Sequence, residues 1–272
     1  MMKTPITYYG GKQKLAPIIN TVIPRHTLYA EPFCGGAAVF FSKRPSEVEV
    51  LNDLNGELIN FYIVVREQFT ALQHQIMLTL HSRKQHRHAW IIYNYPELFD
   101  PVKRAWAVWT LSNLSFAAML DGSFGYDKTD NTTTKKLLSN IDEFTDALCR
   151  RLERAQIECA DALYIIKSRD YEGALFYCDP PYFNSDMGHY RGYTRQDFKQ
   201  LLDTLGAIKG KFLLSSYPSE MLEKYRSKFG WEQRRFEQHV SVNNKAGNPK
   251  VKTEVLTANY PICSELNQLY LF

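Results

Sequence analysis

The first sixty residues alternate between apolar runs and small or polar residues in the order expected of an α/β sheet. Leu28–Ala30 is a compact apolar run that leads into a turn at Cys34–Gly36, and small residues from Ala37 onward favour a helix. Glu47–Leu51 then alternates polar and apolar side chains, as a half-buried strand does, and leads to Asp53. This order of strand, glycine turn, helix and strand predicts the beginning of a βαβ fold.

The middle of the chain changes to helical spacing. Apolar residues between Leu58 and Leu80 recur every three or four positions, which predicts an amphipathic helix, and a second apolar helix is expected over 102–120. The polar, glycine-containing stretch 121–136 predicts a loop or hairpin. A further helix is expected from about 139 to 155.

Runs typical of strands resume after this helix. They lie at Gln156–Cys159, Ala174–Cys178 and Lys211–Ser215 and, as an antiparallel edge, near 237–243 and 251–258. We therefore expect an α/β fold with helices on both faces of the sheet and a mainly helical insertion. The predicted sheet domain comprises 1–58 and 149–272, and the insertion comprises 59–148.

The composition indicates the class of protein and its compartment but does not identify an activity. Lysine and arginine exceed aspartate and glutamate by 33 − 29 = 4, which is too small an excess to identify a partner. No apolar run is long enough to cross a membrane, and Met1–Thr7 lacks the apolar core of a secretory signal. The 5 cysteines and 7 histidines lack metal-ligand spacing, so no metal is expected. The cysteine pattern favours a reduced cytoplasmic protein, and the lack of a long apolar run predicts no membrane partner.

One short segment departs from this even charge balance. Residues 81–88 carry Arg83, Lys84 and Arg87 together with histidines and no acid. Such a cluster is either a solvated helix face or a set of contacts to nucleic-acid phosphates. The sequence leaves both interpretations open.

The sharpest chemical signal is Asp179-Pro180-Pro181-Tyr182, which follows an apolar run that ends at Cys178. Prolines lack an N–H group and restrict the backbone, so they end a strand and leave a rigid turn. In open α/β sheets, ligands bind at turns of this kind, at the carboxyl ends of the strands. The alternative is a purely structural turn, because paired prolines are common in loops.

This tetrad would suit the methylation of an aromatic amine. The exocyclic amino group of adenine is a poor nucleophile because its lone pair is delocalised into the ring. The Asp179 carboxylate and the Pro180 carbonyl could accept both amino hydrogens, which would favour a pyramidal nitrogen. Tyr182 could stack on the base, and its aromatic face would also suit a nearby sulfonium cation.

Two glycine-containing turns could hold a nucleoside cofactor. Glu31–Gly36 has too few glycines for a dinucleotide fingerprint but would allow a ligand without phosphates to approach closely. Asp53 follows at about the offset where an acid meets ribose hydroxyls. Near the N-terminus, Tyr9, Gly10 and Lys12 precede a helix whose first N–H groups could hold a carboxylate, unless this is a solvated turn.

Taken in order, these pieces resemble the Dam-like, alpha-group N6-adenine DNA methyltransferases. That family has a Gly-Gly-Lys element, a Pro-Phe-x-Gly-Gly turn, an acid after the second strand, a helical insertion and Asp-Pro-Pro-Tyr. The matching positions are Tyr9–Lys12, Glu31–Gly36, Asn52–Asp53, 59–148 and Asp179–Tyr182. The resemblance implies a Rossmann-like methyltransferase sheet that uses S-adenosyl-L-methionine.

The resemblance also implies roles in binding the cofactor. S-adenosyl-L-methionine would lie over the glycine turn, with its carboxylate near Lys12 and its ribose near Asp53. Its adenine ring would meet Asp170 and Tyr171. The cofactor-binding residues expected in this way are Tyr9, Gly10, Lys12, Glu31, Phe33, Gly35, Gly36, Asp53, Asp170, Tyr171 and Asp179.

Double-stranded DNA is the partner that the resemblance implies. The target adenine would be flipped out to reach the catalytic residues, and the loop 183–194 could close over it. After Asn113 the sequence departs from the Asn-, Arg- and Gly-rich tract of the family, so no recognition sequence is assigned. The expected base contacts are Ser123, Phe124, Tyr126 and Lys128, and the expected phosphate contacts are Arg83, Lys84 and Arg87.

Other functions remain as alternatives. The tetrad begins with Asp179, whereas cytosine N4 enzymes more often begin theirs with serine, and RNA or glutamine methylases with asparagine. A DNA-binding module that descends from a methyltransferase but lacks the chemistry belongs to a different class. We expect a monomer and leave open whether a companion restriction endonuclease exists.

Overall fold

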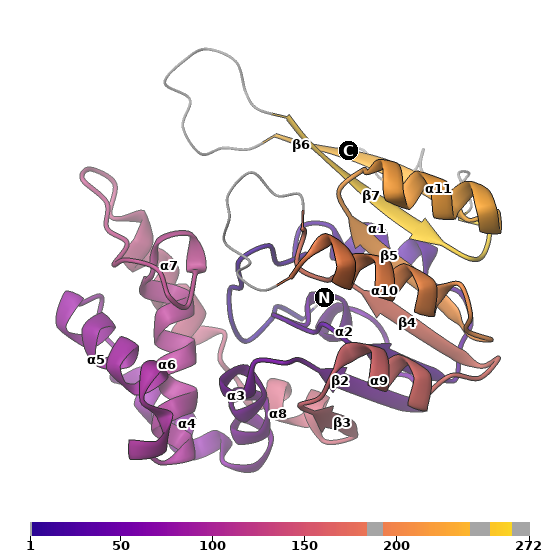
Figure 1. The fold of residues 1–272 in the computed structure, drawn as a ribbon. Helices are drawn as coiled ribbons and strands as arrows, with labels where there is room; N and C mark the ends of the chain where they lie inside the picture. Colours follow the sequence, from indigo (N-terminus) through magenta and orange to yellow (C-terminus); the bar gives the residue numbers. More distant parts are fainter. Residues whose placement is uncertain (1, 184–192, 240–250, 263–272) are drawn as a thin grey trace. The chain divides into compact units, whose positions relative to one another are not determined.

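The computed structural model describes residues 2–183, 193–239 and 251–262 (Figure 1). The chain divides into two compact units. The first comprises Met1–Asn20 and Cys34–Ala160, and the second comprises Thr21–Phe33 and Asp161–Phe272. Both units combine parallel strands with helices, so the mixed α/β class predicted from the sequence is confirmed. The predicted domain boundaries near 58 and 149 do not coincide with the limits of these two compact units, and they stay a prediction.

The first unit is mainly helical around one parallel pair of strands, β2 and β3, with Val50 opposite Gln156. Helix α6 packs against α3, α4 and α5. The elements are α1 (Ala16–Val22, which continues into the second unit), α2 (Ala38–Ser42), β2 (Val48–Asn52), α3 (Gly56–Glu67), α4 (Phe69–Met77), α5 (Arg83–Asn94), η1 (Pro96–Leu98), α6 (Pro101–Leu114), η2 (Phe116–Ala118), α7 (Thr132–Asp142), α8 (Asp146–Leu152) and β3 (Ala155–Glu158).

The predicted long helix through Leu58 and Leu80 is in fact two helices. Gln68 ends α3 and precedes α4 with φ −134° and ψ 37°, a non-helical conformation. The apolar periodicity was correct on both sides of the break, since Leu58 and Leu72 are fully buried. A break that keeps both apolar faces directed at the core leaves no trace in the hydrophobic spacing.

Two other helix limits also differ from the prediction. The polar run Thr132–Lys136 starts α7 rather than a loop, because this helix buries Leu137 and leaves most other side chains exposed or half-exposed. Helix α6 ends at Leu114, and the backbone then turns through Ala117 and Ala118, whose φ values are 55° and 58°. The helix predicted over 139–155 is the end of α7 followed by the short α8.

The second unit contains five strands in the order β1-β4-β5-β7-β6. β1, β4 and β5 are parallel, with Ala30 opposite Phe176 and Cys178 opposite Leu214. The predicted antiparallel edge is present as β7 and β6, but β6 begins at Glu232 rather than near 237, and 240–243 of the predicted strand lie outside the described residues. In Figure 1, helix α10 lies over β4 and β5, and α11 is drawn beside β7. The elements are β1 (Leu28–Glu31), α9 (Ala162–Ser168), β4 (Ala174–Cys178), α10 (Arg195–Leu205), β5 (Lys211–Ser216), α11 (Glu220–Phe229), β6 (Glu232–His239) and β7 (Val251–Ala258).

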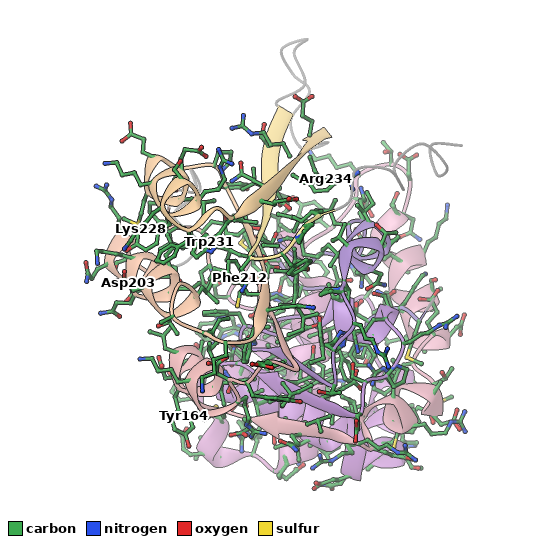
Figure 2. The ribbon with its side chains drawn as sticks, turned by 90° about the vertical axis from the view of Figure 1, so that its right-hand side faces the viewer. Tyr164, Asp203, Phe212, Lys228, Trp231 and Arg234 are labelled. Atoms are coloured by element: carbon green, nitrogen blue, oxygen red, sulfur yellow. The ribbon has the colours of Figure 1, made fainter. Side chains whose placement is uncertain are left out.

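The core of this unit fixes the edge at which β1, β4 and β5 end. All five residues of β4 are buried, and Phe212 of β5 packs edge-on against Trp231 with ring centroids 4.8 Å apart (Figure 2). Because these three strands are parallel, the residues that follow them emerge at one edge of the sheet. That edge therefore carries the segments after Glu31, Cys178 and Ser216.

Two further properties concern the described part of the chain. Within it, no helix combines the length and the apolar character needed to cross a lipid bilayer. Nor, in the same part, do three or more His, Cys, Asp or Glu side chains gather in a way that could hold a metal ion.

Candidate active site

The turn that follows β4 holds its polar side chains in a defined network. The Tyr182 hydroxyl donates a hydrogen bond to Asp179 Oδ1 at 3.1 Å and lies 3.1 Å from the hydroxyl oxygen of Ser215. Ser215 belongs to β5 and is fully buried. Burial and the nearby Asp179 carboxylate raise the pKa of Tyr182 well above its usual value, so the hydroxyl stays protonated at neutral pH.

An aromatic ring from β5 adjoins this network. The rings of Tyr182 and Tyr217 have centroids 4.4 Å apart and are inclined by 60°. Tyr217 directly follows β5 and is only half-buried. Neither Ser215 nor Tyr217 was predicted from the sequence, although a polar and aromatic run after an apolar strand is a usable signal.

The carboxyl end of β1 supplies further groups to the same edge. The buried Glu31 carboxylate accepts a hydrogen bond of 2.7 Å from the Tyr29 hydroxyl. Phe33 meets Tyr193 edge-to-face, with ring centroids 6.3 Å apart. Among the described residues the buried Tyr193 hydroxyl has no hydrogen-bond partner, and burial raises the pKa of Tyr193. A buried donor of this kind is suited to a bound ligand that carries a hydrogen-bond acceptor.

In the first unit, Asp53 holds the glycine turn. Its Oδ2 accepts the Gly35 N–H at 2.9 Å, and its Oδ1 accepts the Asn55 N–H at 3.0 Å. Burial raises the pKa of Asp53, and these N–H groups partly offset that effect. The Tyr62 hydroxyl donates to the Gly35 carbonyl at 2.7 Å, so both backbone polar groups of Gly35 are held by side chains.

Tyr8 forms the back of the glycine turn. A Cβ placed on Gly35 would lie 3.1 Å from the Tyr8 ring, and one on Gly36 would lie 3.0 Å from the Tyr8 Cβ. Gly35 also has a φ of 46°, in the left-handed region. The two glycines therefore serve close packing as well as any ligand, and Tyr8 is a site residue that the sequence did not reveal.

The N-terminal turn directs the Lys12 ammonium to a carbonyl of its own backbone. The Gly11 N–H donates to the Tyr8 carbonyl at 2.9 Å, and Gly10 supplies a φ of 72° beside the half-buried Tyr9. The Lys12 ammonium is buried and donates to the Gly10 carbonyl at 2.9 Å. Lys12 is thus enclosed by its own turn, and its contact with a cofactor carboxylate stays a prediction.

Asp170 and Tyr171 lie away from the catalytic turn. They precede β4 and so lie at its amino end, whereas Asp179 follows its carboxyl end. The Asp170 carboxylate accepts the backbone N–H groups of Lys209 and Gly210 at 2.9–3.0 Å, and the Tyr171 hydroxyl contacts Thr27 at 2.5 Å. Asp170 thus secures the turn into β5, Tyr171 contacts the segment before β1, and their contact with the cofactor stays a prediction.

The predicted hairpin in the first unit is confirmed. The Phe116 N–H donates to the Ser123 carbonyl, and the Gly125 N–H donates to the Leu114 carbonyl, both at 2.7 Å. Phe124 forms the centre of an aromatic cluster: His81 stacks on it at 4.9 Å, and the Arg83 guanidinium lies 4.8 Å from its ring centroid. Phe124 is therefore half-buried, whereas the other predicted DNA contacts are exposed: Arg83, Lys84, Arg87, Ser123, Tyr126 and Lys128.

Most of the predicted closing loop, residues 184–192, lies outside the described residues. Only Phe183, Tyr193 and Thr194 of that loop are described. Phe183 packs against Phe198 of α10 with ring centroids 5.1 Å apart, and Thr194 caps the same helix.

Fold and site together define an α/β enzyme that presents a carboxylate and aromatic rings where parallel strands end. The chain belongs to the D12 class N6 adenine-specific DNA methyltransferase family, whose sequence profile matches residues 8–235. The family resemblance drawn from the sequence is thereby confirmed. The chain is accordingly a methyltransferase, and its methyl donor is S-adenosyl-L-methionine.

Individual relatives agree with this family. A type II methyltransferase of Lactococcus lactis subsp. cremoris, M1.LlaDCHI, is 25% identical over 92% of this chain and 93% of its own length. The DNA N-6-adenine-methyltransferase of Escherichia phage P1 is 27% identical over 70% of this chain but only 25% of its own length. A DNA adenine methylase of Vibrio cholerae is 23% identical over 73% of this chain and 74% of its own length.

Solved structures are more distant. A precorrin 8W decarboxylase from Methanobacterium thermoautotrophicum matches with a TM-score of 0.43 at 7% identity, over 96% of this chain and 100% of that one. A putative RNA methyltransferase from Pyrococcus horikoshii matches with a TM-score of 0.35 at 9% identity, over 90% and 79% of the two chains.

Proposed function

We propose that this chain methylates N6 of an adenine that is flipped out of double-stranded DNA. The observation that carries the site is the Asp179 carboxylate, which follows the fully buried β4 and accepts a hydrogen bond from Tyr182. A strand-end turn cannot reach the amino group of a stacked, paired adenine, so the base must leave the duplex.

Asp179 and Pro180 would act on the acceptor amine. The carboxylate and the Pro180 carbonyl accept its two hydrogens, which localises the lone pair on nitrogen. The new N–C bond would form as the bond between the methyl carbon and the sulfonium sulfur breaks, its electron pair staying on sulfur, and Asp179 would accept the proton that the nitrogen loses. Pro181 stiffens the turn, and Tyr182 with Tyr217, whose ring centroids are 4.4 Å apart, provides the aromatic wall for the base.

The chain contains groups that fit S-adenosyl-L-methionine, which supplies an electrophilic methyl group on a sulfonium. The orphaned Tyr193 hydroxyl offers a donor, and the Gly35–Gly36 turn offers backbone free of side chains. Asn52 clamps both backbone groups of Ala160, at 2.9 and 3.0 Å, so this segment stands beside Asp53. The proposed cofactor contacts are Tyr9, Gly10, Lys12, Glu31, Phe33, Gly35, Gly36, Asp53, Ala160, Asp179 and Tyr193.

Methyl transfer from labelled donor tests this function. Plasmid DNA and ribosomal RNA are incubated side by side with the pure protein, and the labelled nucleosides are separated and identified. Label in N6-methyladenine from DNA is the expected result, and base-resolution mapping then gives the recognition sequence. DNA binding without transfer would support the alternative of a binding module, and label in RNA or on cytosine would reassign the target.

The exposed basic residues of α5 are proposed to contact DNA phosphates. Arg87→Ala is expected to weaken binding about equally for all sequences and to reduce the salt slope by about one. Fluorescence anisotropy with several duplexes measures both effects. Arg150→Ala is the matched control, because Asp146 already pairs with that arginine at 2.7 Å. A change of sequence preference in Arg87→Ala would instead assign this residue to base recognition.

The Tyr182 hydroxyl is proposed to position Asp179. Tyr182→Phe keeps the ring but removes the hydrogen bond of 3.1 Å to the carboxylate. A hydrogen bond to a charged group is worth about 1.5 kcal/mol, so kcat is expected to fall roughly tenfold, with KM for DNA nearly unchanged. Ser215→Ala should produce a smaller loss in kcat. Steady-state kinetics test this prediction. An increase in KM for DNA with an unchanged kcat would show that the hydroxyl serves binding alone.

The cellular setting is proposed from the same family. We place the protein in the cytoplasm as a monomer that acts on double-stranded DNA, alone or beside a companion restriction endonuclease. The predicted target-recognition role of 59–148 rests on the exposed basic residues and the hairpin within that segment.

A further inference from the structure

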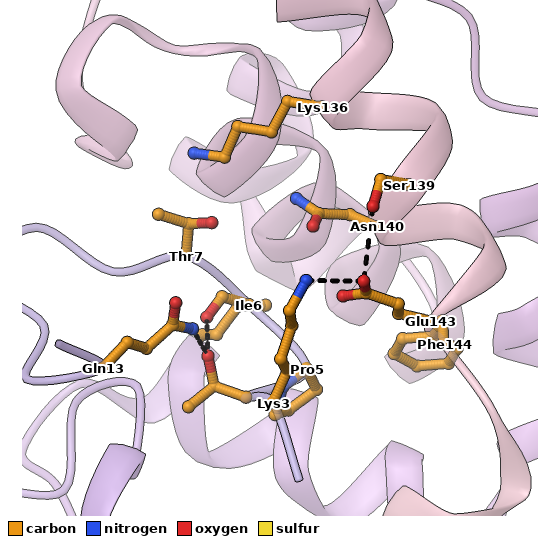
Figure 3. Close-up of a pocket in the computed structure, with 11 residues that line it drawn as sticks. Lys3, Pro5, Ile6, Thr7, Gln13, Lys136, Ser139, Asn140, Glu143 and Phe144 are labelled. Atoms are coloured by element: carbon orange, nitrogen blue, oxygen red, sulfur yellow. Dashed lines mark hydrogen bonds and ion pairs between the residues drawn. The ribbon is translucent and has the colours of Figure 1, made fainter. Parts of the chain in front are cut away.

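A cavity of about 220 Å³ lies in the first unit, between the N-terminal segment 3–7 and helix α7 (Figure 3). Helix α7 contributes Lys136, Ser139 and Asn140 to its wall, and the N-terminal segment contributes Lys3 and Thr7. None of these residues belongs to the proposed catalytic or cofactor groups. The cavity is therefore a separate feature to be explained.

The cavity carries a surplus of positive charge. Lys3 pairs with Glu143 at 2.5 Å, which neutralises both groups. Lys136 is exposed, and among the described residues it has no carboxylate within ion-pair distance. Figure 3 shows its side chain extending from α7 towards Thr7. The cavity thus presents one uncompensated ammonium together with hydroxyl and amide groups.

The position of the cavity links two parts of the unit that the proposed function assigns to DNA and cofactor. Thr7 precedes Tyr8, whose side chain packs against the Gly35–Gly36 turn. On the other wall, the Asn140 amide donates at 2.5 Å to Asn113, just before the hairpin that holds Phe124. Within the first unit, the cavity therefore lies between the segment that leads to the glycine turn and the helix that contacts the base of the hairpin.

We propose that this cavity binds one phosphate of the DNA backbone, with the Lys136 ammonium as its cation and the Thr7 hydroxyl as a hydrogen-bond donor. This inference rests on the proposed function. A phosphodiester suits the cavity because it carries one negative charge and stays partly hydrated, and the volume leaves room for water. The same contact would fix the register of the DNA without reading its sequence.

The test compares Lys136→Ala with Lys135→Ala. Both lysines lie on α7, but only Lys136 lines the cavity. Binding of a fluorescent duplex is measured with S-adenosyl-L-homocysteine present, over a series of NaCl concentrations. Lys136→Ala is expected to reduce the slope of log K against log[salt] by about 0.9, which corresponds to one phosphate. Lys135→Ala should keep the wild-type slope, and Lys136→Arg should restore it.

Three results would overturn the proposal. Equal slopes for wild type and Lys136→Ala would show that no phosphate binds there. The second result would come from calorimetry with S-adenosyl-L-methionine. If Lys136→Ala lost affinity for the cofactor but kept the wild-type slope of log K against log[salt] for DNA, the cavity would be assigned to the methionyl carboxylate. Equal losses in Lys135→Ala and Lys136→Ala would indicate only general surface charge. Methyl transfer to DNA by the wild type is measured in parallel, so failure of this inference is distinguishable from failure of the proposed function.

Discussion

Asp179→Ala is expected to abolish methyl transfer while the protein still folds and binds S-adenosyl-L-methionine. The carboxylate is proposed both to accept an amino hydrogen and to receive the proton that leaves the nitrogen. Loss of a positioned base and of a charged acceptor together should lower kcat by roughly 10³-fold or more. Single-turnover transfer at saturating cofactor and DNA measures this effect without interference from product release.

Two comparisons sharpen this prediction. Glu172→Ala removes an exposed acid at the other end of β4 and should leave the rate unchanged. Asp179→Asn keeps one acceptor oxygen but no charge, so its rate should fall between those of the wild type and Asp179→Ala. If Asp179→Ala turned over at the wild-type rate, the role assigned to this carboxylate would be wrong.

Gly35→Val is expected to have the second largest effect. Gly35 has a φ of 46°, and a Cβ there would lie 3.1 Å from the Tyr8 ring. A side chain in the left-handed region is unfavourable by about 1–2 kcal/mol, and a β-branched one is worse. Because Asp53 binds the Gly35 N–H and Tyr62 binds the Gly35 carbonyl, a displaced turn would also lose these hydrogen bonds. We expect cofactor affinity to fall about 30-fold, equivalent to about 2 kcal/mol.

Gly230→Ala is the matched control for backbone strain. Gly230 also has a positive φ, of 67°, at the end of α11, and a Cβ there would meet nothing within 4 Å. This variant should lower the free energy of unfolding by about 1 kcal/mol and leave cofactor affinity unchanged. Calorimetric titration with S-adenosyl-L-methionine compares the two. Equal cofactor affinity in wild type and Gly35→Val would remove the glycine turn from the proposed site.

The central strands β1, β4 and β5 were predictable because each contains a compact apolar run. β4 is buried on both faces and reads as a continuous apolar stretch, and its end is marked by two prolines. The catalytic turn could therefore be located from local sequence alone. The break at Gln68 could not, because Leu58 and Leu72 stay on the buried face on either side of it.

Site residues that depend on tertiary pairing were the ones missed. Ser215 and Tyr217 reach Tyr182 only because β5 is the parallel neighbour of β4, and no local motif records that pairing. Asp170 shows another limit, since an acid beside an aromatic residue in sequence does not reveal which backbone groups its carboxylate binds. Its carboxylate binds the turn before β5.

A duplex in which the amino group itself is removed tests the central claim most directly. Labelled methyl transfer is measured on a DNA duplex that contains the mapped recognition sequence, and on an otherwise identical duplex with purine in place of the target adenine. The account predicts label at N6 of the adenine in the first duplex and none in the second. Equal label in both duplexes would contradict it, because the strand-end carboxylate would then have no amine to act upon.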